Sequence, residues 1–200
     1  PREKKTLKLG SKRFWRFASL VAILALAAQG ATALMNSKRP NELTLAGMRP
    51  GHDKITAPQK KFRELERDES VTDELLWGDI CTHRELRVEL NASKTVQVVT
   101  VDDNYKPEIM AKCLPTVIEP SRLKLLATGH GLQLGDPCER VGEIYGKPES
   151  ESPSVRGSEQ LELWFYSFDW AGAGVPQVME VSCDAASKKV VAITLAASTL

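Results

Sequence analysis

Two of the four cysteines in this 200-residue chain lie on the apolar faces of segments with different periodicities. Over residues 137–145 the apolar residues recur at helical spacing, and Cys138 belongs to that set. Over residues 178–184 apolar and polar residues alternate as in a strand, and Cys183 is on the apolar side. Both sulfur atoms should therefore face the layer where a helix packs on a sheet. We predict a disulfide between Cys138 and Cys183 in a fold that contains both helix and strand.

The first 33 residues have the composition of an export signal. Residues 2–16 carry seven Lys or Arg and one acid, residues 17–28 carry no charge, and residues 29–33 end in a small-x-small pattern that signal peptidase accepts. As a helix the apolar core spans roughly 18 Å, whereas a bilayer core is about 30 Å thick. We predict a cleaved signal peptide, a body that does not insert into the membrane, and a periplasmic or extracellular location. An uncleaved anchor over residues 17–34 and a buried helix are the alternatives.

Charge is divided unevenly along the chain. The formal net charge is +1, but residues 1–33 contribute +6, so the remainder has 20 basic and 25 acidic residues. A nucleic-acid-binding protein needs a basic surface to displace counterions. We therefore expect a protein partner rather than nucleic acid or anionic lipid. The pattern does not indicate an oligomeric state.

Cys81 and Cys113 are the other two cysteines. In an exported chain four cysteines suggest two disulfides, for which spacing alone permits three connectivities. A bond between Cys138 and Cys183 leaves Cys81–Cys113 as the second pair. Metal binding is the alternative, but the chain has no C-x-x-C motif, and structural zinc sites use paired ligands at short spacing. We expect no metal and no cofactor.

The body contains an imperfect internal repeat. In the second copy we predict a helix over 137–145, a polar loop over 149–160, and strands over 161–170, 178–184 and 190–196. In the first copy we predict a helical segment within 52–67 and strands over 86–90 and 96–101. Trp77 in this copy corresponds to Trp164 in the second, 87 residues later. Chance similarity of two hairpins is the alternative.

The repeat predicts the fold class and the domain organisation. We expect an α+β fold of two tandem repeats, each a helix followed by a three-stranded antiparallel meander. Together the repeats would form a helix-backed sheet with an open face. The predicted divisions are a signal peptide or anchor, a linker, and two repeats, over residues 1–33, 34–44, 45–118 and 119–200.

Short motifs in the second copy resemble a known family. The run L-x-L-G-D-P-x-x-R-V-x-x-I-Y-G-x-P over residues 132–148, L-W-x-Y over 163–166 and V-x-x-I over 190–193 resemble the SmpA/OmlA (BamE-like) family. The tandem arrangement with disulfides also resembles the β-lactamase inhibitory protein, which doubles that unit. The resemblance implies a helix-backed antiparallel sheet whose concave open face binds another protein. The chain lacks the lipid-attachment Cys of the lipoprotein branch, and no residue pattern identifies a β-lactamase as its target.

The strand predicted over residues 161–170 is apolar on both sides. Its odd positions include Leu161, Leu163 and Phe165, and its even positions are Trp164, Tyr166, Phe168 and Trp170. Since a strand alternates faces, one set packs on the helices and the other points away. Exposed aromatic side chains mark interaction sites. We predict that the even set forms a partner-binding patch on the outer sheet face; the alternative is that a neighbouring segment covers it.

No catalytic motif can be assigned. The glycines around His130 miss the dinucleotide-binding fingerprint by one residue, and the acid pairs at 102–103 and 149/151 lie in predicted loops. We therefore predict a non-catalytic protein-binding module. The alternatives are an extracytoplasmic enzyme that uses His130 in a cleft between the repeats, and an envelope scaffold held by the uncleaved leader.

Peptide mapping of the mature protein under non-reducing conditions tests the predicted pairing. We expect one disulfide-linked peptide containing Cys138 and Cys183 and a second containing Cys81 and Cys113. Recovery of a Cys81–Cys138 peptide would contradict the pairing.

Overall fold

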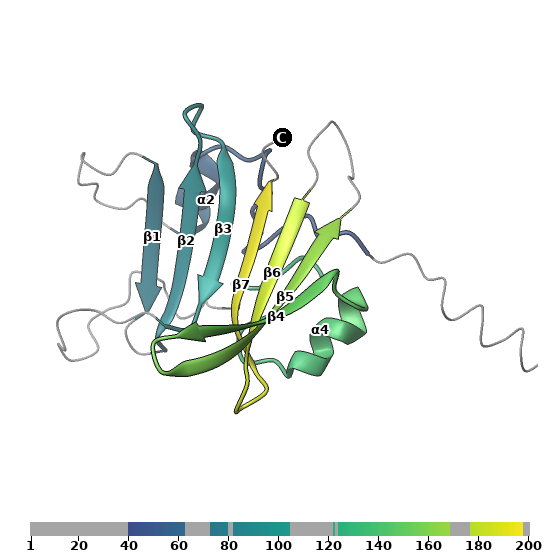
Figure 1. Ribbon diagram of the computed structural model, residues 1–200. Coiled ribbons are helices and arrows are strands. Elements are labelled where there is room, and N and C mark those ends of the chain that lie inside the picture. Colours follow the sequence, from purple (N-terminus) through teal and green to yellow (C-terminus); the bar gives the residue numbers. More distant parts are fainter. Residues whose placement is uncertain are drawn as a thin grey trace, which may run out of the picture. The chain divides into compact units, whose positions relative to one another are not determined.

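A computed structural model of the chain has two units, residues 1–39 and residues 40–200. The structure describes residues 40–62, 73–79, 82–104, 122, 124–168 and 177–197, all of which belong to the second unit. These residues form a seven-stranded antiparallel sheet with two short helices (Figure 1). In chain order the elements are α2 (Thr56–Phe62), β1 (Glu74–Asp79), β2 (Arg84–Leu90), β3 (Val96–Asp102), α4 (Cys138–Tyr145), β4 (Ser150–Arg156), β5 (Glu159–Phe168), β6 (Gln177–Asp184) and β7 (Val190–Ala197).

The sheet order is β1-β2-β3-β7-β6-β5-β4. Strands that follow one another along the chain are neighbours, except that β3 pairs with the last strand, β7. In that pair Val99 lies opposite Leu195 and Val101 opposite Ile193, and all four side chains are fully buried. The β3–β7 pair therefore joins the two halves of the described chain into one sheet.

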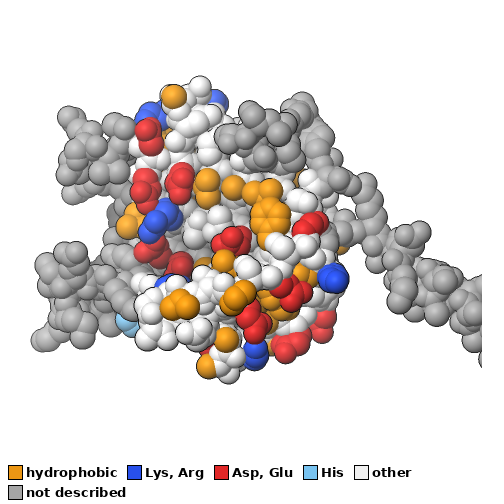
Figure 2. All heavy atoms as spheres, viewed as in Figure 1, with side chains coloured by type: hydrophobic (Ala, Val, Ile, Leu, Met, Phe, Trp, Pro, Cys, Tyr) orange, Lys and Arg blue, Asp and Glu red, His pale blue; other side chains and the backbone are white. Residues whose placement is uncertain are grey.

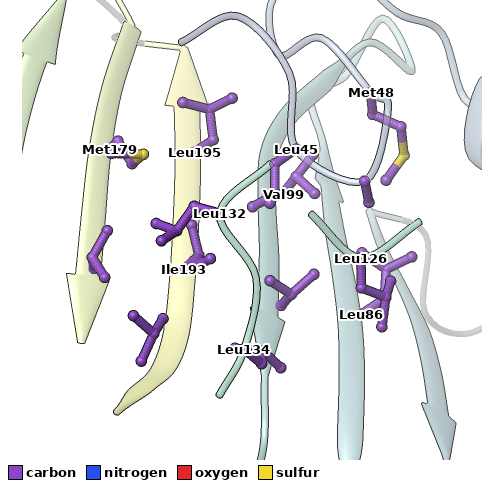
Figure 3. Packing of buried hydrophobic residues seen from close by; sticks show 14 of the residues in the cluster. Leu45, Met48, Leu86, Val99, Leu126, Leu132, Leu134, Met179, Ile193 and Leu195 are labelled. Carbon is purple, nitrogen blue, oxygen red and sulfur yellow. The ribbon is translucent and has the colours of Figure 1, made fainter. Parts of the chain in front are cut away.

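One face of the sheet is covered, and the core lies on this side. The core is one cluster that contains the inward side chains of the strands together with Phe62 of α2 and Val141 and Tyr145 of α4. Since these helices have only 7 and 8 residues, they cannot cover seven strands. Loop residues supply the rest of the cover, as Figure 3 shows. These loop residues are Leu45, Met48, Leu126, Leu132 and Leu134.

Each helix packs through a short apolar stripe. Pro58 lies in the first turn of α2, where a missing backbone N–H breaks no helical hydrogen bond. Phe62 at the end of α2 packs on Trp77 of β1, with ring centroids 5.9 Å apart. On α4 the buried positions are Cys138, Val141 and Tyr145, as the helical periodicity predicted.

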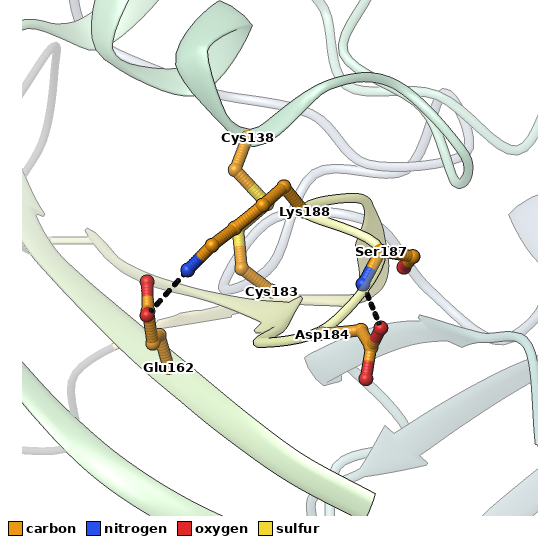
Figure 4. The surroundings of a disulfide bond; sticks show 6 residues. All are labelled: Cys138, Glu162, Cys183, Asp184, Ser187 and Lys188. Atoms are coloured by element: carbon orange, nitrogen blue, oxygen red, sulfur yellow. Dashed lines mark hydrogen bonds and ion pairs between the residues drawn. A yellow bond between two sulfur atoms is a disulfide. The ribbon is translucent and has the colours of Figure 1, made fainter.

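The structure confirms the disulfide between Cys138 and Cys183. It joins the first residue of α4 to β6, with the two Cα atoms 6.1 Å apart, and it lies between the helix and the sheet (Figure 4). Cys81 and Cys113 lie outside the described residues, as does the predicted boundary between residues 118 and 119. Among the described residues no helix is long and apolar enough to cross a membrane.

The predicted fold class is wrong. The described chain is a largely β fold built on a single sheet, not two tandem helix-plus-meander repeats. The second half has four strands, because residues 150–156, predicted as part of a polar loop, form β4. This strand has no apolar alternation because it lies at the edge of the sheet, where its backbone pairs with β5 while most of its side chains meet water.

Removing the disulfide should destabilise the sheet without preventing its formation. In the chain-entropy model, a bridge that closes 45 positions contributes about 4 kcal/mol. We expect the double variant Cys138→Ala/Cys183→Ala to lose up to that amount of unfolding free energy, measured by urea denaturation. A loss below about 1 kcal/mol would show that α4 is held by packing alone.

Candidate functional site

Two of the predicted binding residues are buried on the covered face. Tyr166 is 0% and Phe168 4% exposed, and both lie against Tyr145 of α4, with ring centroids 5.8 and 6.0 Å away. The Tyr166 hydroxyl donates to the carbonyl of Gly146, 3.1 Å away. The prediction that these rings point outward is therefore wrong for both residues, and the alternative, that a neighbouring segment covers them, holds. Trp170 lies outside the described residues.

The opposite side of β5 belongs to a face to which the described residues contribute no helix. We call it the open face and define it by Val98 and Thr100 of β3, Leu163 and Phe165 of β5, Val178 and Glu180 of β6, and Thr194 and Ala196 of β7. The strand register places these side chains beside one another across four strands. Phe165 lies opposite Glu180, and Val178 opposite Ala196. All are partly exposed except Glu180, which is exposed.

The β4–β5 hairpin bends over one end of the open face (Figure 1). Near its tip, Arg156 binds both carboxylate oxygens of Asp102, at 3.0 and 3.1 Å, and Asp103 at 2.9 Å. Leu161 and Ala192, which point to this side, are only 6% and 9% exposed. Burial raises the pKa of Asp103, although the guanidinium of Arg156 opposes this shift.

The open face is acidic around an apolar centre. Figure 2 shows hydrophobic side chains gathered near the middle of this side of the sheet, with acidic groups around them. Arg87 of β2 is paired with Glu74 at 3.1 Å and Glu85 at 2.8 Å. Glu89 also interacts electrostatically with Arg87, so one base faces three acids, and the carboxylate of Glu180 forms no ion pair with any described residue. A partner with apolar side chains flanked by basic residues would complement this face.

Trp164, a third predicted binding residue, lies on the covered side but is only partly buried. It lines a shallow pocket of about 200 Å³ together with four residues of the β4–β5 hairpin. These residues are Glu151, Ser152, Pro153 and Glu162. Trp164 is therefore accessible, although on the other side of the strand from the open face.

A buried carboxylate lies at the centre of a hydrogen-bond network on the covered side. Glu42 is 1% exposed, and its Oε2 accepts hydrogen bonds from Tyr145 Oη at 2.7 Å, from His130 Nδ1 at 2.9 Å and from the His130 backbone N–H at 3.1 Å. Its Oε1 accepts the backbone N–H groups of Leu43, Thr44 and Gly129. A buried charge with this many donors is fully satisfied.

The donors in this network can be assigned. Because the Tyr145 hydroxyl donates its one proton to Glu42, the contact of 2.8 Å between Thr128 Oγ1 and Tyr145 Oη has Thr128 as the donor. The backbone N–H of Leu132 donates to Thr128 in turn, at 3.1 Å. A carboxylate has no proton to give, so His130 donates from Nδ1.

The network shifts the pKa values of Glu42 and Tyr145 in opposite directions, and both shifts favour a charged carboxylate beside a protonated hydroxyl. Burial raises the pKa of Glu42, but hydrogen bonds from Thr44, Tyr145 and His130 outweigh it, so the pKa lies below its usual value of 4.5. Burial, reinforced by the negative charge of Glu42, raises the pKa of Tyr145, which stays protonated and keeps donating.

The network also requires a glycine at position 129, because a Cβ there would lie 2.7 Å from both Glu42 Oε1 and Thr44 Oγ1.

The network gives His130 a structural role that the sequence did not show. The enzyme alternative would use His130, whose Nδ1 lies 2.9 Å from the carboxylate of Glu42. The long-range contacts of this carboxylate, however, fasten residues 42–44 to the loop at 128–132 and to the end of α4. Glu42 lies in the linker predicted over residues 34–44. Local sequence does not reveal its role, because its partners are distant in the chain.

No protein-family model matches the chain, and no curated protein matches it. Among solved structures, a DUF4309 family protein (YjgB) from Bacillus subtilis is similar over 76% of this chain and 83% of its own, with 11% sequence identity and a TM-score of 0.42. A similarity at this level supports no inference about function. The resemblance to the SmpA/OmlA family therefore stays a prediction, based on the motifs of residues 132–148, 163–166 and 190–193.

Replacing Glu42 should change the pH dependence of stability. Since the folded-state pKa is lowered, the ionised carboxylate stabilises the fold above pH 4.5, and this contribution is lost as the pH falls through the folded-state pKa. We expect Glu42→Gln to lose about 1–3 kcal/mol at pH 7 and to show a weaker decline of unfolding free energy in acid. Urea denaturation at several pH values measures this, with Glu180→Gln as the exposed control. A parallel decline in wild type and Glu42→Gln would contradict the assignment.

Proposed function

We propose that this protein is an exported, non-catalytic binding module that docks a protein partner on its open face. The observation that carries the proposal is the row of partly exposed apolar side chains across neighbouring strands of that face. Phe165 and Leu163 of β5 and Val178 of β6 belong to this row. Apolar groups left accessible on a sheet are typical of interaction surfaces.

The charge on the open face indicates the chemistry of the partner. Glu180 borders the apolar row without an ion-pair partner among the described residues, and Glu89 shares the single positive charge of Arg87 with two other acids. Basic groups on a partner would therefore find favourable positions there. Electrostatic complementarity of this kind speeds association and makes it sensitive to salt. The partner therefore has apolar side chains flanked by Lys or Arg.

Export is supported by the leader and by the disulfide. The basic and apolar composition of residues 1–33 is typical of a signal peptide. The disulfide between Cys138 and Cys183 fits an oxidising compartment, where such bonds persist. The proposed location is periplasmic or extracellular; an uncleaved anchor over residues 17–34 is the alternative, which N-terminal sequencing of the mature protein would reveal.

Changes to the open face should abolish partner capture. We expect Phe165→Ser and Thr194→Arg to lose the partner that the wild type retains from the exported fraction, because one removes a ring and the other adds bulk and charge. Capture followed by mass spectrometry measures this. Val155→Ser is the matched control, since Val155 is 60% exposed on the other side of the same hairpin.

The variants must be folded for this comparison to count. Circular dichroism should show the wild-type fold for Thr194→Arg, whose side chain is partly exposed. Its unfolding temperature should fall only slightly, because the variant gives up the hydrogen bond to Thr100 but no buried apolar contact. If folded Phe165→Ser and Thr194→Arg retain the same partners as the wild type, the open face is not the docking surface.

A further inference from the structure

The pocket beside Trp164 combines an aromatic wall with two carboxylates. Within the hairpin Trp164 lies directly opposite Glu151, and Glu162 lies opposite Pro153, so these two cross-strand pairs are neighbours on one face. Trp164 is partly buried against the core and also lines the pocket. A flat ring held in place next to two carboxylates can receive a planar cation.

The charges around the pocket are not balanced. Glu162 is paired with Lys188, whose Nζ lies 2.8 Å from Oε1, but both side chains are about half exposed. This pair shows that Glu162 accepts a cation in its present orientation (Figure 4). The carboxylate of Glu151 has no counter-ion among the described residues, which leaves one negative charge at the pocket.

The size of the pocket limits what it can hold. The pocket has a volume of about 200 Å³, whereas typical small-molecule sites have about 300–1,000 Å³. It is therefore large enough only for the head group of one side chain. Arginine fits better than lysine, because its guanidinium is planar, stacks on an indole and binds carboxylates through two parallel hydrogen bonds.

We propose that this pocket binds a guanidinium group, supplied by an arginine side chain of a protein ligand. The guanidinium stacks on Trp164 and donates to Glu151, and it competes with Lys188 for Glu162. The site goes beyond the proposed open-face docking, because Trp164 and Phe165 are adjacent in sequence and point to opposite sides of β5. Each proposal can therefore fail without the other.

Titration of the full chain with arginine derivatives tests the pocket directly. The readout is the indole N–H resonance of Trp164 in an NMR spectrum, assigned from a Trp164→Phe variant. We expect N-acetyl-arginine amide to shift this resonance in a saturable way. N-acetyl-citrulline amide, which has the same shape without the charge, should bind at least about tenfold more weakly.

Variants of the acidic residues provide the second test. We expect Glu151→Gln to weaken binding of the arginine derivative about three- to tenfold, and Lys188→Ala to strengthen it about two- to threefold because Glu162 is released. Glu180→Gln is the matched control on the open face and should leave the affinity unchanged. Equal binding of citrulline and arginine, or no effect of Glu151→Gln, would overturn the proposal.

The source of the guanidinium can be distinguished in the same experiment. A capped peptide with one internal arginine should bind more tightly than free L-arginine, because the free α-carboxylate is repelled by Glu151. If only free arginine shifts the Trp164 resonance, the pocket holds a small molecule and the assignment to a protein ligand is wrong.

Discussion

The pairing of β3 with β7 is the contact on which the rest of the structure depends. It joins strands far apart in the chain, as in the 3.1 Å contact between Thr100 and Thr194, which are separated by 94 residues. Closing such a distance costs chain entropy, which burial of the facing Val, Leu and Ile side chains offsets. Because the pairing creates one sheet of seven strands, a single apolar face extends across both halves and must be covered as a whole.

The cover is held in place by α4, which is fastened at both ends. Its first residue, Cys138, is bonded to β6 through Cys183, and its last residue, Tyr145, donates to the buried carboxylate of Glu42. Glu42 also binds the loop at 128–132, so the segment that begins the described chain, the loop and the helix are held together. These contacts let two short helices and several loops act as a layer over a much larger sheet.

The two faces of β5 offer two different surfaces to a ligand. Strand alternation directs Phe165 to the open face and Trp164 to the pocket, while Arg156 near the hairpin tip holds β4 and β5 against Asp102. Both surfaces carry uncompensated carboxylates next to apolar or aromatic groups. A basic partner that contacts the edge of the sheet at β4 could therefore use either surface, and the arginine pocket would add specificity to the apolar contact.

The sequence alone determined the helix at residues 137–145, the positions of most strands and the pairing of Cys138 with Cys183. Those features follow from local periodicity and from which face each cysteine occupies. Only the tertiary structure decided that β4 forms, since an edge strand needs no apolar alternation, and that the halves share one sheet instead of forming repeats. It also decided which side of β5 is covered. Both sides are apolar, so periodicity cannot distinguish them, and the choice depends on where Tyr145 of α4 packs on β5.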